Sequence, residues 1–346
     1  MALTEDKLIE RIRRRIPSSA DAVLRLGIGD DAAVLRPVRG TEWALSCDQF
    51  IEGVHFLVEA HPPEVVGYKA LARATSDLAA MGARPRFFLL SLMLPASRTG
   101  RWLDRMLTGM SRAARRFGLT LAGGDTAASI GRSAGRSGRK AAGGVALNLT
   151  VMGELEAGCG VSRSGARAGD AIFVAGELGA AQLGLEIILR GMHRQRRWRH
   201  LLTPHYYPKL GIEIGRWLVR HQMASAMMDL SDGLSTDLTR LCRASRVGAR
   251  IAEQSLPAVS VPEALCAKGI DARALALHGG EDYGLLFTVP KRWASRLPRL
   301  LYGTRITRIG EIVRGRGVNN GVELIAANGR STPLEPKGWD HFRIVK

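Results

Sequence analysis

The amino-acid sequence predicts a two-domain α/β protein, with α and β segments mixed in both halves. Its 346 residues exceed what one domain of ordinary size needs, and they suffice for two domains with separate cores. Strand-like and helix-like patterns follow one another throughout the chain. The Gly158-Cys159-Gly160 stretch separates the two halves. We therefore expect an N-terminal domain over residues 1–157 and a C-terminal domain over residues 158–346.

The elements of the first half follow from apolar patterns bounded by Gly and Pro. Thr4 can cap a first helix, with Glu5 and Asp6 in its first turn, where the helix dipole favours anions. Further helices are predicted over residues 63–81 and 101–117. Strands are predicted over residues 24–26, 43–46, 86–94, 119–122 and 145–152. The low-complexity stretch of residues 129–144 is expected to be a surface loop.

The second half shows the same alternation of patterns. Strands are predicted over residues 171–175, 226–228, 283–289 and 306–312. Helices are predicted near residues 179–189, 207–222, 234–245 and 290–297. This half is therefore also expected to combine a sheet with helices.

The formal net charge of +18 raises the question of nucleic-acid binding. Much of the excess lies in residues 11–15, 132–140 and 194–199. No zinc-finger spacing or pattern of stacking aromatic residues accompanies these runs. We interpret them as solvated basic faces, and we do not expect nucleic acid to be a partner.

The cysteines and the apolar runs bear on the cellular compartment. Cys47, Cys159, Cys242 and Cys266 are far apart and form no Cys-x-x-Cys pair, which argues against a zinc site or a disulfide framework. The longest apolar run, residues 87–95, is too short to cross a bilayer, and the acidic residues near the N-terminus do not suit a signal peptide. We expect a cytoplasmic protein without a membrane anchor.

Acidic residues stand beside Gly or Ser at five places, each of which the sequence predicts to be a turn. The five are Gly29-Asp30-Asp31, Ser46-Cys47-Asp48, Gly123-Gly124-Asp125-Thr126, Asp229-Leu230-Ser231-Asp232-Gly233 and Gly279-Gly280-Glu281-Asp282. Carboxylates are scarce in this chain, with 32 Asp and Glu against 50 Lys and Arg. Mg²⁺ takes oxygen ligands and is usually held by a few carboxylates together with substrate phosphates. The pattern therefore indicates a magnesium-nucleotide enzyme.

Several other nucleotide and catalytic motifs can be excluded. Residues 27–32 match the spacing of a dinucleotide-binding fingerprint, but two aspartates in that turn would repel a bare phosphate. The chain has no P-loop and no His-Glu-x-x-His motif. On the predicted helix over residues 63–81, Asp77 shares a face with Ala70 and Ala74. Asp77 is therefore expected to point toward the interior or a cleft.

Seven motifs, taken together, resemble the thiamine-monophosphate kinase family. They are Gly27-Ile-Gly-Asp-Asp-Ala-Ala-Val34, Gly53-Val-His-Phe56, Ser76-Asp-Leu-Ala-Ala-Met-Gly-Ala83, Gly123-Gly-Asp-Thr126, Asp229-Leu-Ser-Asp-Gly233, Gly279-Gly-Glu-Asp-Tyr283 and Gly338-Trp-Asp-His-Phe342. The resemblance implies phosphoryl transfer from ATP to thiamine monophosphate with the help of several Mg²⁺ ions. It also implies the two-domain fold of aminoimidazole ribonucleotide synthetase, in which the N-terminal sheet forms the interface of a homodimer.

The same resemblance assigns the residues of the site. The implied magnesium ligands are Asp31, Ser46, Cys47, Asp48, Asp77, Asp125, Asp229 and Asp232. Asp48, Asp125 and Asp232 are the residues implied to be catalytic. The implied ATP contacts are Gly124, Asp125, Arg163 and Ser231, and the implied thiamine contacts are His55, Glu281 and Trp339. Structural roles compete for His55 in a loop and for Trp339 in a core.

Two residues depart from the pattern of the family. Cys47 stands where the family usually has Thr, which removes a hydroxyl group near the metal. The change is harmless if only the main-chain carbonyl at this position binds metal. Gly284 stands where the family commonly has Glu.

The chemistry of the reaction explains the carboxylates independently. The acceptor is itself a phosphate with a second pKa of about 6, so it needs no general base at neutral pH. Phosphoryl transfer depends mainly on positioning and on neutralisation of charge by metal ions. The open alternatives are another ATP-dependent enzyme of the superfamily, such as an aminoimidazole ribonucleotide synthetase or a selenophosphate synthetase, a non-catalytic thiamine-binding protein and a basic RNA-binding protein on the same scaffold.

Overall fold

The chain forms two compact units in a computed structural model that describes residues 5–16, 23–26, 33–129, 143–315 and 321–340. Unit 1 comprises Met1–Leu78 and Arg84–Ala157, and unit 2 comprises Ala79–Ala83 and Gly158–Lys346. Within the described ranges, no helix has both the length and the apolar character needed to span a bilayer.

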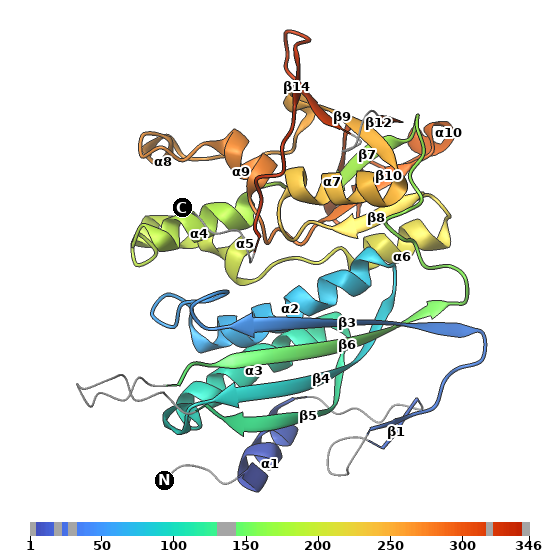
Figure 1. Cartoon of the computed structure of the whole chain (residues 1–346). Helices are drawn as coiled ribbons and strands as arrows, with labels where there is room; N and C mark the ends of the chain where they lie inside the picture. The colour runs from blue at the N-terminus through green and yellow to red at the C-terminus, as the bar shows by residue number, and fades with distance from the viewer. Residues whose placement is uncertain (1–4, 17–22, 27–32, 130–142, 316–320, 341–346) are drawn as a thin grey trace, which may run out of the picture. The chain divides into compact units, whose positions relative to one another are not determined.

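Unit 1 is built on a sheet whose described strands run in the order β3-β6-β4-β5 (Figure 1). These strands are β3 (Thr41–Ile51), β4 (Arg84–Leu94), β5 (Thr120–Ala128) and β6 (Ala146–Glu156). β4 and β5 pair in parallel, whereas β6 pairs antiparallel with both β3 and β4. β3 and β5 therefore form the two edges of the sheet.

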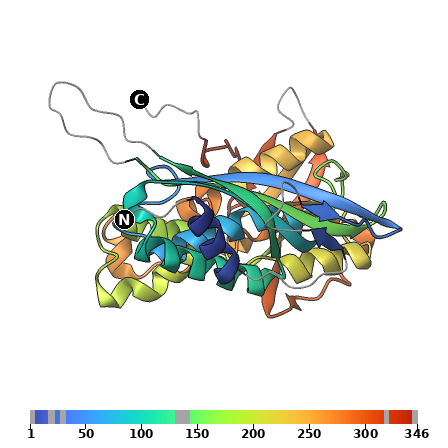
Figure 2. The same ribbon diagram turned by 90° about the horizontal axis from the view of Figure 1, so that it is seen from below.

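The helices of unit 1 cover one face of this sheet (Figure 2). They are α1 (Glu5–Arg15), α2 (Pro63–Ala80) and α3 (Arg101–Phe117), with the 3-10 helix η1 (Ala96–Arg98) before α3. Phe88, Leu90 and Leu92 of β4 are buried on the helical side. β1 (Leu24–Leu26) and β2 (Val34–Leu35) pack against Phe87 and Met152 of the sheet. α3 stops at Gly118, whose left-handed φ of 73° suits glycine.

Two of the turns expected from the sequence proved wrong, because both segments lie inside strands. Ser46-Cys47-Asp48 falls within β3, and Gly123-Gly124-Asp125 falls within β5. The glycines of β5 permit a close approach between strands, since a Cβ atom at Gly124 would lie 1.9 Å from the carbonyl oxygen of Leu90. Glycine in a strand often marks such an approach. The Gly29-Asp30-Asp31 motif and most of residues 129–144 lie outside the described residues.

Unit 2 is built on a mixed sheet, whose described strands follow the order β14-β13-β9-β12-β7-β10-β8, with β11 paired to β12. The strands are β7 (Ala171–Ala175), β8 (Ala226–Asp229), β9 (Val247–Ala252), β10 (Leu285–Val289), β11 (Leu300–Leu301), β12 (Thr304–Arg314), β13 (Val322–Ile325) and β14 (Ser331–Pro333). Most neighbours pair antiparallel, and β13 pairs in parallel with β9.

Helices and 3-10 turns connect these strands. They are α4 (Ala180–Leu189), η3 (Arg196–Leu202), α5 (Thr203–Tyr206), α6 (Ile212–Arg220), α7 (Leu234–Ser245), η4 (Glu253–Ser255), α8 (Glu263–Cys266), α9 (Ala272–His278) and α10 (Lys291–Ala294). Apolar residues of α7 and α9 share a buried core with β7, β8 and β10. The predicted α7 is confirmed to the residue, whereas α6 begins five residues later than predicted, after Pro208 and Gly211.

The main chains of α2 and α3 touch through a pair of glycines. A Cβ atom at Gly67 would lie 1.9 Å from the carbonyl oxygen of Met106, and one at Gly109 would lie 1.9 Å from the carbonyl oxygen of Glu64. Only residues without a side chain permit this approach.

We predict that Gly109→Ala lowers the free energy of unfolding by roughly 1–3 kcal/mol, the usual cost of forcing an extra methyl group into a packed contact. Alanine favours a helix over glycine by about 1 kcal/mol, so propensity alone predicts the opposite sign. Gly100→Ala is a control for the added methyl group alone, because no atom lies within 4 Å of its Cβ. Gly100 is the N-cap of α3, where alanine is less favourable than glycine, so only a small loss of stability is expected there. Urea unfolding of both variants measures the difference. Equal stabilities would show that the two helices are less closely packed.

Candidate active site

Four polar side chains of unit 1 gather between β3 and α2. Ser46 and Asp48 alternate with Cys47 along β3, so their side chains share the face that α2 covers. Asp77 accepts a short hydrogen bond from the hydroxyl group of Ser46. Arg73, one helical turn before Asp77, places its Nε atom 3.6 Å from a carboxylate oxygen of Asp48. The structure thus brings together three of the predicted metal ligands and adds an arginine that the sequence did not indicate.

Asp125 lies on the opposite face of the same sheet. The register aligns it with Ser91 of β4, and Ser91 with Asn148 of β6, so these three side chains share one face. Cys47 belongs to that face as well, because its thiol donates to the side-chain oxygen of Asn148 at 3.1 Å. Three strand spacings of about 4.8 Å separate the two edge strands, or roughly 14 Å. Asp48 and Asp125 of one chain are therefore far apart.

His55 has a structural role in the loop that follows β3. Its Nδ1 atom accepts a hydrogen bond from the backbone N–H of Ile51 at 3.0 Å. The ring stacks on Phe50, with a centroid distance of 5.7 Å. Gly53 turns the loop with a φ of 80°. These contacts fix the position of the ring in a half-buried residue.

Three segments of unit 2 that are far apart in sequence are joined by backbone hydrogen bonds. Glu281 donates its N–H to the carbonyl oxygen of Ser231 at 2.8 Å, and Tyr283 donates to Leu230 at 2.8 Å. Trp339 donates to the carbonyl oxygen of Asp232 at 3.0 Å. The structure therefore brings together the predicted motifs around Asp229, Glu281 and Trp339.

Trp339 is placed by the glycine that precedes it. Gly338 donates its N–H to the hydroxyl oxygen of Thr236 at 3.0 Å. A Cβ atom at Gly338 would lie 1.9 Å from the carbonyl oxygen of Asp232, so only glycine allows the segment to lie this close. Trp339 is 51% exposed. A core role, the competing interpretation, does not suit a ring exposed to this extent.

The carboxylates after β8 form an electrostatic cluster. Asp229 and Asp237 are buried, and Asp237 accepts hydrogen bonds from the backbone N–H groups of Asp232 and Gly233 at 3.1 Å. Burial, followed by the negative charges of Asp229 and Asp232, raises the pKa of Asp237 to about 7. Arg240 pairs with both Asp232 and Asp237. Neither Asp237 nor Arg240 was predicted to belong to the site.

Asp282, next to Glu281, has a structural role as a helix cap. Its carboxylate accepts hydrogen bonds from the backbone N–H of Gly179 at 2.6 Å and of Ala181 at 3.0 Å. It thereby caps the first turn of α4. Burial raises the pKa of Asp282 to about 7, although these two hydrogen bonds favour its charged form.

Two of the predicted ATP contacts are not neighbours. The carbonyl oxygen of Ser162 accepts from Met227 at the start of β8, and that of Arg163 accepts from Ser245, the last residue of α7. Ser231 follows the other end of β8 and precedes the other end of α7. The main chain of Arg163 therefore lies across the length of these elements from Ser231. The Arg163 side chain is exposed.

The described residues contain no group of three or more His, Cys, Asp or Glu side chains arranged to hold a metal ion. Asp31, a further predicted ligand, lies outside the described residues. The donors that are present, Ser46 with Asp77 and Asp229 with Asp232, supply hard oxygen atoms. Such small sets fit Mg²⁺, which keeps waters and shares its coordination with phosphate oxygens. They do not suit zinc, which prefers nitrogen and sulfur ligands.

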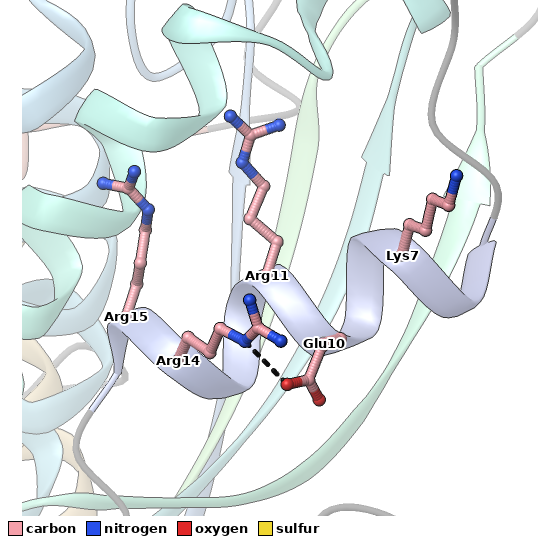
Figure 3. Close-up of a pocket in the computed structure, with 5 residues that line it drawn as sticks. All are labelled: Lys7, Glu10, Arg11, Arg14 and Arg15. Atoms are coloured by element: carbon pink, nitrogen blue, oxygen red, sulfur yellow. Dashed lines mark hydrogen bonds and ion pairs between the residues drawn. The ribbon is translucent and has the colours of Figure 1, made fainter.

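A hollow of about 650 Å³ beside α1 is distinct from these predicted site residues (Figure 3). It is lined by Lys7, Glu10, Arg11, Arg14 and Arg15. Arg11 and Arg15 form ion pairs with Asp104 of α3, and Arg14 pairs with Glu10 at 2.7 Å. Two carboxylates, Asp104 and Glu10, therefore offset part of the charge of the four cations, and none of the predicted site residues lines this hollow.

Comparison with known proteins assigns this fold and these motifs to a class. Residues 29–155 match the family described as "AIR synthase related protein, N-terminal domain", and residues 167–322 match "AIR synthase related protein, C-terminal domain". Together with the mixed sheets of both units, these matches confirm the predicted fold class. The protein is of the two-domain AIR synthase related class.

Individual relatives narrow the assignment. The chain is 35% identical to thiamine-monophosphate kinase of Salmonella typhimurium, with 99% of both chains covered. A solved thiamine-monophosphate kinase of Stenotrophomonas maltophilia K279a has a TM-score of 0.77 and 33% identity, with 96% of this chain and 99% of that chain covered. A structure described as "AaThiL complexed with AMPPCP and TMP" has a TM-score of 0.72 and 34% identity, with 98% and 97% covered. This chain belongs to the thiamine-monophosphate kinase family, as its motifs predicted.

Proposed function

We propose that this protein transfers the γ-phosphoryl group of ATP to thiamine monophosphate, giving thiamine diphosphate and ADP. The observation that carries the proposal is the joining of Ser231, Glu281 and Trp339 by backbone hydrogen bonds. These residues are the implied contacts of ATP and of the thiamine moiety. The relatives that are 33–35% identical over nearly the whole chain bear the same activity in their names.

The predicted metal ligands are proposed to bind Mg²⁺ and thereby to orient the phosphate groups of the substrates. Mg²⁺, when bound, neutralises phosphate charge so that donor and acceptor can approach each other. In unit 1, Ser46, Asp48 and Asp77 would provide its oxygen ligands, with Asp125 on the other face of the sheet. The main chain of Cys47 and the carboxylate of Asp31 are proposed as further ligands from unit 1. In unit 2, Asp229 and Asp232 would provide oxygen ligands. The thiol of Cys47 is turned toward Asn148, away from the face that carries Ser46.

The organic substrates would be bound by other groups. Ser231 and the main chain at Gly124 are proposed to contact ATP, and Arg163 to contact its phosphates through a guanidinium group suited to anions. Glu281 and Trp339 are proposed to bind the cationic thiamine moiety, with His55 as a further contact. A cytoplasmic location belongs to the same proposal, and the four cysteines of the described chain are all unpaired with one another.

The face of the unit 1 sheet opposite the helices supports a homodimer. Leu45 of β3 is 65% exposed and Met93 of β4 is 42% exposed on that face, an arrangement that favours burial against another surface. Asp125 lies on the same face, so a second copy would bring its own Asp125 to the interface. We predict a dimer mass by light scattering for the wild-type protein and a lower mass for Leu45→Asp. A monomeric wild-type protein at micromolar concentration would contradict this part of the proposal.

The activity is tested directly by incubating purified protein with Mg-ATP and thiamine monophosphate, and by measuring thiamine diphosphate and ADP by chromatography. We predict that Asp48→Asn and Asp125→Asn each lower kcat by at least about 100-fold, since loss of electrostatic stabilisation commonly costs about 3–4 kcal/mol. Asp271→Asn is the matched control, because Asp271 only caps α9. A folded Asp125→Asn protein with a near-normal rate would overturn this role of Asp125.

The proposed role of Trp339 gives a second kinetic prediction. A cation over an indole face gains roughly 0.5–2 kcal/mol, so Trp339→Ala should raise KM for thiamine monophosphate by about 2- to 30-fold. KM for ATP should be nearly unchanged, and Trp339→Phe should recover much of the loss. Trp293→Ala serves as control, because Trp293 packs between Arg292 and Arg296. Equal damage to both KM values with a lower melting temperature would indicate a structural tryptophan.

A further inference from the structure

His205 is a buried polar residue that the sequence did not connect with the site. It lies in the short helix α5 and is 1% exposed. Its Nδ1 atom lies 3.3 Å from the Oε2 atom of Glu281, whose side chain is 20% exposed. Burying a polar ring without a partner costs free energy. The contact with the carboxylate therefore stabilises the ring and holds one end of the Glu281 side chain.

The main chain of Glu281 is held in place independently of the contact with His205. Glu281 has a left-handed φ of 67°, which is uncommon for a residue with a side chain. Its N–H group donates to the carbonyl oxygen of Ser231 at 2.8 Å. The main chain of Glu281 is thus tied to the motif that contains Ser231 and Asp232. The direction of its side chain is then set by whatever its carboxylate touches.

The position of His205 is fixed by the helix that packs on it. A Cβ atom at Gly184 of α4 would lie 2.7 Å from the Cβ atom of His205. The absence of a side chain at Gly184 therefore leaves the room that His205 occupies. The same helix α4 is capped by Asp282, the residue after Glu281. Both partners of the contact are thus tied to one helix.

We infer that His205 is a positioning residue that holds the Glu281 carboxylate ready for the substrate. This inference rests on the proposed function, in which Glu281 contacts the thiamine moiety. A carboxylate offers about four acceptor positions, so a contact with one imidazole nitrogen leaves it able to accept from the amino group of a pyrimidine. A free glutamate side chain loses rotamer freedom when it is ordered. His205 removes this cost from substrate binding, because the carboxylate is already ordered.

The test is a double-mutant cycle with separate KM values for the two substrates. We expect His205→Leu to raise KM for thiamine monophosphate by roughly 3- to 30-fold, in line with the ordering cost, and to leave KM for ATP within about twofold. His205→Asn, whose amide can reach a position near that of Nδ1, should restore most of the binding. In a Glu281→Gln background, His205→Leu should have little further effect.

His221→Leu is the matched control for the loss of an imidazole ring. His221 directly follows α6 and is exposed; its Nδ1 atom contacts the carbonyl oxygen of Trp217 and its ring stacks on the Trp217 ring, so neither KM should change. If His205→Leu does not fold, the cycle is run with His205→Asn and His205→Gln. The Gln amide lies one bond further out, so Gln should raise KM for thiamine monophosphate more than Asn does.

The outcomes separate this inference from the proposed function. A wild-type protein that forms no thiamine diphosphate overturns both. If Glu281→Gln raises KM for thiamine monophosphate while the His205 variants do not, the proposed function stands and the positioning role is wrong. Equal rises in both KM values, or additive effects of the two substitutions, would also overturn the positioning role, since they indicate a general loss of structure.

Discussion

The candidate site of unit 2 depends on one constraint, the backbone hydrogen bonds that tie three distant segments together. The segment after β8 accepts N–H groups from Glu281, from Tyr283 and from Trp339. Two glycines allow the segments to come this close, because Gly338 lies against the carbonyl oxygen of Asp232 and Gly280 lies against that of Ser231. Backbone bonds leave the side chains of these segments available for chemistry. The positions of Asp232, Glu281 and Trp339 are therefore set by the main chain.

Much of the fold could be predicted from local patterns, and what was missed depends on contacts between distant residues. α2, α3 and α7 have apolar periodicity with Pro or Gly at their ends. β9 was not predicted, because its sequence Val247–Ala252 includes Gly and Arg and owes its structure to pairing with β12 and β13. The motif around Asp125 resembled a turn because its pairing with the distant strand β4 is not visible in the local sequence. Gly123 and Gly124 signal flexibility locally, whereas in the sheet they admit the neighbouring strand.

The residues of the site also divide into those that local motifs predict and those whose role depends on contacts between distant residues. Motif spacing indicated Asp229, Glu281 and Trp339, and the structure joins them. Motif spacing could not indicate Arg73, Arg240 or His205, because an arginine or a histidine on a helix forms no recognisable motif with its neighbours in sequence. Their importance arises from partners that lie elsewhere in the sequence, such as Asp48 for Arg73 and Glu281 for His205. Nor could spacing show that Asp48 and Asp125 occupy opposite faces of one sheet, since that follows from the register of β3, β6, β4 and β5.

Some of the many arginines in this chain form ion pairs with acidic residues of the candidate site. Arg73 lies beside Asp48, and Arg240 beside Asp232 and Asp237. Burial, followed by repulsion from the carboxylates of Asp229 and Asp232, raises the pKa of Asp237, and the positive charge of Arg240 opposes this rise. A guanidinium group keeps its charge at every physiological pH, and its fork can contact two carboxylates at once. The arginines can therefore compensate these carboxylates in the protein alone, at sites whose oxygen atoms also suit Mg²⁺.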